Sequence, residues 1–536
     1  MAETGKAPTE TRGQIPVLIL KEGTSRTRGR EALLQNINVA KALAEAVRST
    51  LGPKGMQKML VDSFGDVTIT NDGATVMKEI EVEHPTAKML VQVSKTQDQE
   101  AGDGTTTSVI LTGELLSNAA ELLDLNIHPS IIVNGYKMAS NKALEVINKT
   151  AISVDWKDEK VLKQVAMVAL GSKTAGIHKE LLSELAVKAA LKVVQERDGK
   201  RIVDLDDIKI EKKEGGTLSD TKLIQGIVVD KEIVHPGMKR RIEKPKIALI
   251  ESALEIKKLE MDSKLSITSP EKMKEFMEQE KNIVKEIIDK IKETGATFVF
   301  CQKGIDDIAQ HYLAKYGISA VRRVRKSDME KLAKATGGKI VANIRDLTSK
   351  DLGTADLVEE RKVGDDKMVF VEGCKNPRAV SILIRGGSKQ VLDEAERSIH
   401  DALSVVKNVI EDGKIVAGGG AIEAEIAMAL EDYAESVGGK EQMVIEKYAS
   451  AVESIPKTLI ENSGFDVVTK MGELKKKHHE GQKYAGIDVY TGKIVDMKEK
   501  GIIEPARVKL QAIKSASEAA EAILRIDDII ASSKIH

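Results

Sequence analysis

The apolar and polar positions follow one pattern at the two ends of the chain and another in its middle. Across residues 36–50 apolar side chains recur at helical spacing, and Gly52-Pro53 ends the predicted helix. Helical patterns continue to about residue 150 and return after residue 377, with early interruptions by predicted strands at residues 15–20 and 67–69. Helix-rich ends around a different middle predict nested domains, in which the outer halves close together.

The middle of the chain carries short apolar runs separated by helical patterns. Runs of this length, bounded by polar residues, are typical of buried strands. They lie at residues 224–229, 247–250, 297–300, 318–321 and 369–371. Their alternation with helices predicts a mixed α/β domain.

Residues 254–290 differ from the rest of this middle part. They are rich in Lys, Glu and Met, are interrupted by Thr268-Ser269-Pro270, and set apolar side chains such as Met261 and Met273 among charges. Two interpretations stay open from the pattern alone. The segment is either an amphipathic helix packed on its own domain or a protruding arm whose flexible methionines meet variable partners.

Composition narrows the class of protein. A length of 536 residues fits about three or four domains at roughly 150 residues each. With six Phe, seven Tyr and one Trp, the cores must consist mainly of aliphatic side chains. Lys+Arg (82) and Asp+Glu (83) nearly cancel, which argues against recruitment of nucleic acid or of an anionic membrane surface.

The sequence also predicts a cytoplasmic location. Cys301 and Cys374 are too few for a disulfide framework and fit a reducing compartment. No apolar stretch is long enough to span a membrane, and the N-terminus lacks the core of a signal peptide. The histidines show no zinc-like spacing, and we expect His478-His479, in a Lys-rich run, to lie in a solvated loop.

The strongest chemical signal is the turn Gly102-Asp103-Gly104-Thr105-Thr106-Thr107, directly before an apolar run. Glycines let backbone N–H groups approach an anion, and a helix N-terminus adds unpaired donors and the positive end of a dipole. Asp103 supplies a hard oxygen ligand of the kind that Mg²⁺ prefers. The turn therefore suggests a nucleoside triphosphate site, although such a turn taken alone is more often an ordinary helix N-cap.

Two common nucleotide motifs are excluded. The phosphate loop G-x-x-x-x-G-K-[ST] is absent, since its nearest approach between Gly486 and Lys493 has the wrong spacing and ends in Ile494. The dinucleotide fingerprint fails because threonine follows Gly104 where the third glycine belongs. Gly418-Gly419-Gly420, before a long Ala/Glu helix, is a second turn where a ring or phosphate group can approach the backbone.

Taken in order along the chain, these motifs resemble those of chaperonins. They are Thr50-Leu51-Gly52-Pro53-Lys54-Gly55, Asn71-Asp72-Gly73, the 102–107 turn and Gly418-Gly419-Gly420. Residues 301–307 and 323–337 resemble the group II branch, which includes the archaeal thermosome and the eukaryotic cytosolic chaperonin. The resemblance runs from about residue 15 to residue 532 and makes the simple N-cap interpretation of the 102–107 turn the minor one. Family members often end in a Gly/Met-rich tail, which this sequence does not contain.

The resemblance implies a multidomain α and α/β fold with three domains. An all-helical equatorial domain would comprise residues 1–152 and 408–536, and a small intermediate domain residues 153–222 and 377–407. An α/β apical domain would comprise residues 223–376. Within it, residues 254–290 would form the helical protrusion that acts as a built-in lid.

The resemblance also implies roles for individual residues. Asp72 and Asp401 match the catalytic carboxylates, and Asp103 matches the Mg²⁺ ligand. The implied nucleotide-binding residues, among them a nucleotide-sensing lysine and a ribose-binding acid, are Thr50, Leu51, Gly52, Pro53, Asp103, Gly104, Thr105, Thr106, Thr107, Lys173, Gly419, Gly420 and Glu504. Asp401, an acid in a charged helix, has no local signature of its own.

The function expected from the resemblance is that of an ATP-dependent chaperone. With ATP and Mg²⁺ as cofactors, the subunit would join identical or paralogous subunits in stacked rings of eight or nine and enclose non-native protein clients. Two alternatives belong to other classes: a metabolic phosphotransferase, for which no acceptor-activating motif is present, and an ATP-binding structural scaffold or filament whose folding activity is secondary. The set of Asp72, Asp103 and Asp401 favours turnover over a purely structural part.

Overall fold

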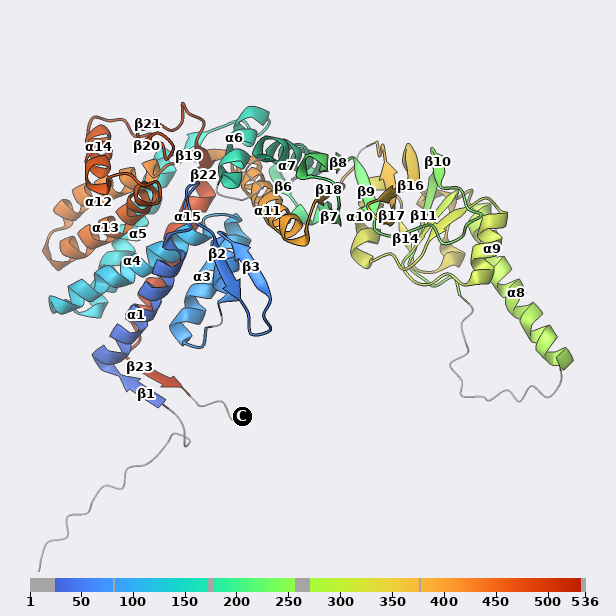
Figure 1. The fold of residues 1–536 in the computed structure, drawn as a ribbon, viewed down its shortest axis with the longest axis horizontal. Helices are drawn as coiled ribbons and strands as arrows, with labels where there is room; N and C mark the ends of the chain where they lie inside the picture. Colours follow the sequence, from blue (N-terminus) through green and yellow to red (C-terminus); the bar gives the residue numbers. More distant parts are fainter. Residues whose placement is uncertain (1–24, 81, 172–177, 256–269, 376, 532–536) are drawn as a thin grey trace, which may run out of the picture.

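The computed structural model describes residues 25–80, 82–171, 178–255, 270–375 and 377–531 and is elongated (Figure 1). A helical bundle lies at one end, an α/β unit at the other, and a smaller mixed unit between them. The chain is therefore multidomain, with α and α/β parts. The strand predicted at residues 15–20 lies outside the described residues.

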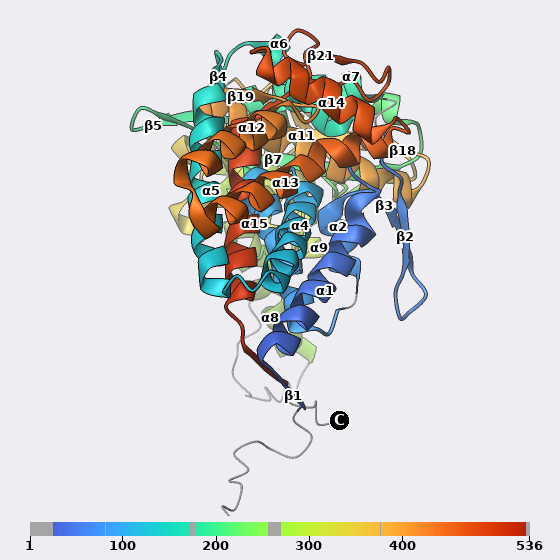
Figure 2. The ribbon, with the colours of Figure 1, turned by 90° about the vertical axis from the view of Figure 1, so that its left-hand side faces the viewer.

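The helical end is built from both ends of the chain. Its helices are α1 (Gly29–Arg48), α2 (Gly73–Glu79), α3 (Pro85–Ala101), α4 (Thr105–Asp124), α5 (Pro129–Thr150), α12 (Ala421–Val437), α13 (Gly439–Asn462), α14 (Val467–His479) and α15 (Ala506–Leu524). The α4 helix packs on α1, α13 and α15, so the two halves of the sequence interdigitate (Figure 2). The helix predicted over residues 36–50 is present as α1, which begins earlier.

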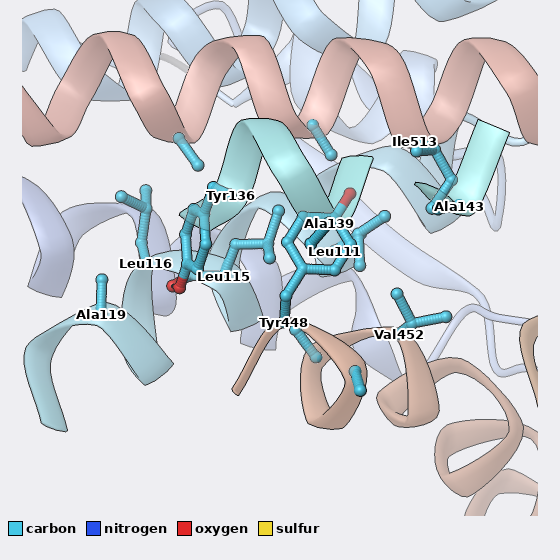
Figure 3. Packing of buried hydrophobic residues seen from close by; sticks show 14 of the residues in the cluster. Leu111, Leu115, Leu116, Ala119, Tyr136, Ala139, Ala143, Tyr448, Val452 and Ile513 are labelled. Carbon is cyan, nitrogen blue, oxygen red and sulfur yellow. The ribbon is translucent and has the colours of Figure 1, made fainter. Parts of the chain in front are cut away.

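One apolar cluster, which we name the helical core, fills this bundle with buried side chains from residues 33–147 and 416–524. At its centre the rings of Tyr136 and Tyr448 meet edge to face, with centroids 5.5 Å apart (Figure 3). Both rings are fully buried, and their hydroxyls are satisfied: Tyr136 donates to the Leu115 carbonyl at 2.6 Å, and Tyr448 pairs with Ser517 at 2.7 Å. Aliphatic packing and two satisfied tyrosines thus join the N-terminal and C-terminal helices.

The helical end also contains several small sheets of short strands. The two chain ends pair as β1 (Ser25–Arg28) and β23 (Asp528–Ala531), and β2 (Lys58–Val61) pairs with β3 (Val67–Thr70). A three-stranded sheet has the order β22-β19-β4, from Ile503–Pro505, Lys414–Ala417 and Ile152–Ser153. A last pair joins β20 (Ala485–Ile487) to β21 (Ile494–Asp496).

A second cluster, the linking core, is formed mainly by buried apolar residues from 162–208 and 380–415. The long helix α11 (Lys389–Asp412) packs here on α6 (Glu159–Leu170) and α7 (Lys179–Val193). The strands of this unit are β5 (Val194–Arg197), β6 (Lys200–Val203), β7 (Ile208–Glu214), β8 (Lys222–Ile224) and β18 (Val380–Gly386). In its sheet, β18 lies between β7 and β8.

A third cluster, the α/β core, draws on residues 227–379. One sheet contains the parallel strands β11 (Lys246–Ile250), β12 (Phe298–Cys301), β13 (Ser319–Val321) and β14 (Ile340–Val341), with β15 (Gly353–Thr354) antiparallel to β11. The other sheet is antiparallel and has the order β10-β16-β17-β9, from Arg241–Glu243, Leu357–Val363, Asp366–Glu372 and Gly226–Val229. Four of the five apolar runs each overlap one strand, and the run at 224–229 is divided between the end of β8 and β9, which belong to different sheets. The predicted α/β middle is confirmed.

The helices of the α/β end are α8 (Pro270–Glu293), α9 (Asp307–Lys315) and α10 (Lys326–Thr336). The last turns of α8 are anchored in the α/β core by Val284, Ile288 and Ile291, and the rest of the helix extends away from the molecule (Figure 1). Residues 256–269 of the predicted arm, with Met261, lie outside the described residues.

The linking core and the α/β core meet at α10 through two ion pairs. In one pair α10 supplies the acid, and in the other it supplies the base. Lys209 of β7 lies 2.8 Å from Asp328 of α10 and also donates to the Val228 carbonyl at 2.8 Å. Asp207, just before β7, pairs with Lys334 of α10. Lys209, Asp328 and Asp207 are all less than 10% exposed, so this junction contains charges withdrawn from water.

The loop predicted for His478-His479 is wrong, and of the two side chains only that of His479 is exposed to solvent. These residues end α14, and His478 is buried with its Nδ1 2.8 Å from Glu425 and its Nε2 2.9 Å from the Ala485 carbonyl. Because Met471, Leu474 and His478 recur at helical spacing, they share the face that packs inward. The Lys-rich neighbours obscured this periodicity.

Candidate functional site

A cavity of about 280 Å³ lies where turns of the helical end meet α6 of the linking core. Of the residues implied to bind nucleotide or to act in catalysis, those that line it are Thr50, Leu51, Gly52, Pro53, Asp72, Asp103, Gly104, Thr105, Thr106, Thr107, Gly419, Gly420 and Glu504. Residues from positions 50 to 504 thus converge on one space. Asp401 is not among the lining residues, and Lys173 lies outside the described part of the chain.

Two helices begin at the cavity without a side-chain cap. The α4 helix starts after Gly104 and α12 starts after Gly420, and both glycines have left-handed backbone angles, with φ of 80° and 79°. Neither position has room for a side chain, since a Cβ would lie 2.8 Å from Val508 and 2.6 Å from Pro456, respectively. The first-turn N–H groups and the positive dipole ends of two helices are therefore available to an anion.

Close contact between two turns brings Asp72 beside the start of α4. A Cβ on Gly73 would lie 2.5 Å from the Thr106 Oγ1 and 2.7 Å from the Thr106 nitrogen. Only glycine permits this approach. The turn that holds Asp72 and the turn that holds Asp103 therefore line the same cavity.

Each of these two carboxylates is oriented by a local hydrogen bond. Asp72 is the N-cap of α2, and its Oδ2 accepts from the Thr75 nitrogen at 2.9 Å and from the Thr75 hydroxyl at 2.7 Å. Asp103 Oδ1 accepts from the Gly104 nitrogen at 2.7 Å. The capping role of Asp72 is an ordinary structural one, and it holds the side chain in place at the cavity wall.

A buried charge cluster forms a further part of the wall. Lys509 of α15 lies 2.8 Å from Glu504 and 2.9 Å from Glu423. Burial opposes the charged form of Lys509, but its two carboxylate partners outweigh burial and raise its pKa above the ordinary lysine value. Burial, together with Glu423 and Asp103, raises the pKa of Glu504 despite the nearby lysine.

Sequence reasoning missed several cationic and apolar residues of this site. Lys179, Lys500 and Lys509 line the cavity, as do the buried Ile487 and the exposed Tyr490. One signal was available for Lys509, because it falls on the apolar stripe of α15 with Ala512, Ile513 and Ala516. A lysine on such a face needs buried partners. Lys500 had no comparable signal.

Asp401 lies on α11, which passes close to the Asp103 turn. One helical turn after Asp401, Ser404 packs so tightly that a Cβ on Gly102 would lie 2.0 Å from its Cβ. Another turn on, Asn408 Nδ2 donates to the Ala101 carbonyl at 2.7 Å. Because residues three and seven apart share a face of a helix, Asp401 lies on the face of α11 that contacts this turn.

The residues present fit a Mg²⁺–nucleotide. The described residues contain no group of three or more His, Cys, Asp or Glu side chains that could hold a metal by themselves. Mg²⁺ needs no such group, because one or two carboxylates, waters and the substrate phosphates usually complete its shell. Asp103 and Asp72 supply hard oxygen donors next to two helix N-termini suited to phosphate.

Comparison with known proteins gives the family. Residues 43–534 match the TCP-1/cpn60 chaperonin family. The chain belongs to this family. As a chaperonin it is a molecular chaperone that acts in protein folding.

Individual relatives agree with this assignment. A thermosome subunit of Pyrococcus horikoshii is 61% identical over 520 residues, which cover 97% of this chaperonin and 95% of the relative. The thermosome subunits beta and alpha of Archaeoglobus fulgidus are 59% and 57% identical over 516 residues, covering 96% of this chain and 95% of each relative. Along the described part of this chaperonin, no helix has the length and apolarity needed to cross a membrane.

Proposed function

We propose that this chaperonin subunit binds and hydrolyses ATP in the cavity described above and uses the cycle to enclose unfolded protein. The observation that carries the proposal is the cavity wall where Asp72 and Asp103 lie beside the uncapped N-termini of α4 and α12. Carboxylates and exposed amide donors at one place suit a phosphoryl group that carries a metal ion.

The residues divide the chemistry between them. The amides at the starts of α4 and α12 bind phosphate oxygens, and the Thr105–Thr107 hydroxyls add donors. Asp103 would hold Mg²⁺, and the bound ion would supply positive charge to the phosphate groups. Asp72, fixed by Thr75, orients the attacking water and accepts its proton.

Asp401 completes the site through movement of α11. Ser404 and Asn408 contact the Asp103 turn, and Asp401 lies one to two turns before them on the same helix. Rotation of α11 about that contact would carry Asp401 to the cavity. Hydrolysis would then require closure, which couples turnover to domain movement.

We assign the three cores to the three domains expected for the family. The equatorial domain is residues 1–152 and 408–536, the intermediate domain 153–222 and 377–407, and the apical domain 223–376. Residues 254–290, with α8, form the lid. The helical and α/β cores support this division, and the linking core consists mainly of intermediate-domain residues together with equatorial residues such as Val409, Ile415 and Val508.

The proposed partners are non-native protein clients and other copies or paralogues of the subunit in stacked eight- or nine-membered rings. The alpha and beta names of the Archaeoglobus fulgidus relatives support paralogous subunits. Electron microscopy with and without ATP and Mg²⁺ tests the assembly: double rings that close with nucleotide are expected, and a filament would favour the scaffold alternative.

The catalytic assignment is tested with Asp401→Ala. Because Asp401 does not line the cavity, ADP binding should stay within about twofold of wild type, and ATP turnover should fall at least about tenfold. Calorimetry measures the binding, and phosphate release measures the turnover.

The matched control is Asp393→Ala. Asp393 is an acid on the same helix, two turns earlier, and it does not line the cavity. Its carboxylate lies 2.6 Å from the Lys212 ammonium group. Its turnover should match that of wild type. Near-normal phosphate release from Asp401→Ala would refute the role of Asp401, and absence of ADP binding by the wild type would refute the proposed function itself.

A further inference from the structure

Two buried side-chain amides hold the turn that contains Asp103. Gln97 of α3 and Asn408 of α11 are 0% and 2% exposed. Gln97 Nε2 donates to the Asp103 carbonyl at 2.7 Å, and Asn408 Nδ2 donates to the Ala101 carbonyl at 2.7 Å. The carbonyls on both sides of Gly102 are therefore fixed from two different helices.

The orientation of each amide is determined by its partners. Gln97 Nε2 also lies 3.1 Å from the Val508 carbonyl, so its NH₂ group faces two acceptors, where an amide oxygen would be repelled. Asn408 Oδ1 lies 3.1 Å from Arg507, which can only donate, so its NH₂ group must point to Ala101. Through Arg507 and Val508 both amides are also tied to the first turn of α15.

The Gln97 contact reaches the Asp103 carboxylate through one rigid unit. The Asp103 carbonyl and the Gly104 N–H belong to the same planar peptide group, so fixing one fixes the direction of the other. That N–H donates to Asp103 Oδ1 at 2.7 Å. Gln97 therefore aims the carboxylate without touching it.

The Asn408 contact acts on α11 instead. Asn408 lies seven residues after Asp401 on the same face of the helix, and it joins that face to the Ala101 carbonyl. Gly102 provides the neighbouring contact, with Ser404 packed against it. Asn408 is thus the polar link between the helix that carries Asp401 and the turn that carries Asp103.

We propose that Gln97 and Asn408 are positioning residues of this site, Gln97 for the metal-binding geometry of Asp103 and Asn408 for the placement of α11 and Asp401. This inference rests on the proposed function. An amide that holds the backbone of a metal-binding residue acts on the metal indirectly. Loss of such support typically lowers metal affinity or activity by about 10- to 100-fold. The two residues should therefore fail in different ways.

The test compares Gln97→Met and Asn408→Leu in the full chain. For Gln97→Met, the Mg²⁺ concentration that half-saturates ADP binding should rise about tenfold, with ADP affinity in EDTA within about twofold of wild type. For Asn408→Leu, both binding parameters should stay within about twofold, and ATP turnover should fall about tenfold. Hydrogen exchange at residues 102–104 should quicken in both variants without nucleotide.

The matched control is Gln310→Met. Gln310 of α9 is a buried amide that donates to the Ile305 carbonyl at 2.8 Å, in the α/β core far along the chain from the cavity. It should change none of these readouts. If Gln97→Met folds poorly, Gln97→Asn, which keeps the amide but shortens its reach, replaces it.

The outcomes are distinguishable. The inference would be overturned if Gln97→Met lost ADP affinity equally with and without Mg²⁺. It would also be overturned if hydrogen exchange at residues 102–104 in the two variants equalled that of the Gln310→Met control. A wild type that binds no ADP would instead overturn the proposed function, and hydrogen exchange, which needs no nucleotide, would still decide whether the amides hold the turn.

Discussion

The cavity and the junction at α10 both join parts of the chain that are far apart in sequence, and they do so by different means. At the cavity, turns approach through glycines and backbone groups, as where Gly73 packs on the first turn of α4. At the junction, Lys209 reaches Asp328 and Asp207 reaches Lys334, so charged side chains make the contact. The contact between the cavity turns is thus made at the main chain, whereas the contact at the junction is made by paired charges.

The difference has mechanical meaning. Close backbone contact allows a single geometry, so the Asp72 and Asp103 turns keep their relative position while other parts move. A buried ion pair is tolerated only while both partners are together, because a lone buried charge is costly. Burial, with a smaller contribution from the Asp204 charge, raises the pKa of Asp207, and Lys334 acts against that shift. The junction therefore holds firmly in one arrangement and fails abruptly once its partners separate.

The largest expected effect comes from breaking the junction. Lys209→Met leaves Asp328 buried without its cation and should cost about 3–5 kcal/mol. Adding Asp328→Leu should recover only part of that loss, because Glu211, 3.2 Å from Lys209, also loses its cation. Urea unfolding followed by Trp156 fluorescence measures both, since Trp156 is the single tryptophan and packs on the linking core. The double-mutant cycle gives the coupling free energy between Lys209 and Asp328.

A less buried group of ion pairs in the same unit is the control. Lys212 pairs with Asp393 and Glu396, and the three side chains are 33%, 33% and 39% exposed. Lys212→Met should therefore cost less than about 1 kcal/mol. If Lys209→Met proves no more costly than Lys212→Met, withdrawal of charge from water is not what holds the junction.

The second effect concerns the backbone contact at the cavity. Gly73→Ala forces the Asp72 and Asp103 turns apart, because its Cβ would meet the Thr106 nitrogen at 2.7 Å. A misplacement of about 1 Å should weaken ADP binding with Mg²⁺ about 100-fold, as measured by calorimetry. The control Gly472→Ala, where a Cβ meets nothing within 4 Å, should leave binding unchanged and raise stability by about 0.5–1 kcal/mol.

The smallest expected effect is a pH dependence of stability that arises from an ion pair beside the cavity. Asp488 is buried beside Lys500, which lines the cavity. Burial acts to raise the pKa of Asp488, but Lys500, the Thr491 hydroxyl and the Tyr490 N–H outweigh it and lower the pKa to about 2, from 3.8. A lowered folded-state pKa stabilises the protein above about pH 4, and the contribution disappears as the pH falls toward 2.

Asp488→Asn should therefore lose about 2 kcal/mol at pH 7 and almost nothing at pH 2. Urea titrations at the two pH values measure the difference. Lys500→Met should remove most of the same pH dependence; an undiminished dependence in that variant would mean that Lys500 is not its source.

The comparison also explains what the sequence could and could not predict. The strands at residues 247–250 and 298–301 are short apolar runs buried on both faces, and the α1 periodicity is regular, so both were predictable. The hairpin strand β2 was missed because only alternate residues of Lys58–Val61 are partly buried and no long pattern forms. Residue 478 was assigned to a loop because lysines flank a helical face.

The same distinction applies to the site. The turn at residues 102–107 is local, so its glycines, acid and hydroxyls can be recognised without knowledge of the fold. Gln97, Asn408 and Lys509 act across 6 to more than 300 residues, and an amide or lysine within a helix has no local signature of such a role. Their importance arises only when distant helices meet.

The helical core has a consequence for how the protein is made. Its apolar residues come from 33–147 and from 416–524, with α4 packed between helices of both segments. Between Ile147 and Val416 the ribosome adds about 270 residues, which takes roughly 13 to 54 s at about 5–20 residues per second. Throughout that interval the first half of the bundle is a nascent chain with its apolar faces uncovered. This chaperonin is thus itself a protein whose nascent chain is prone to aggregation while it is being synthesised.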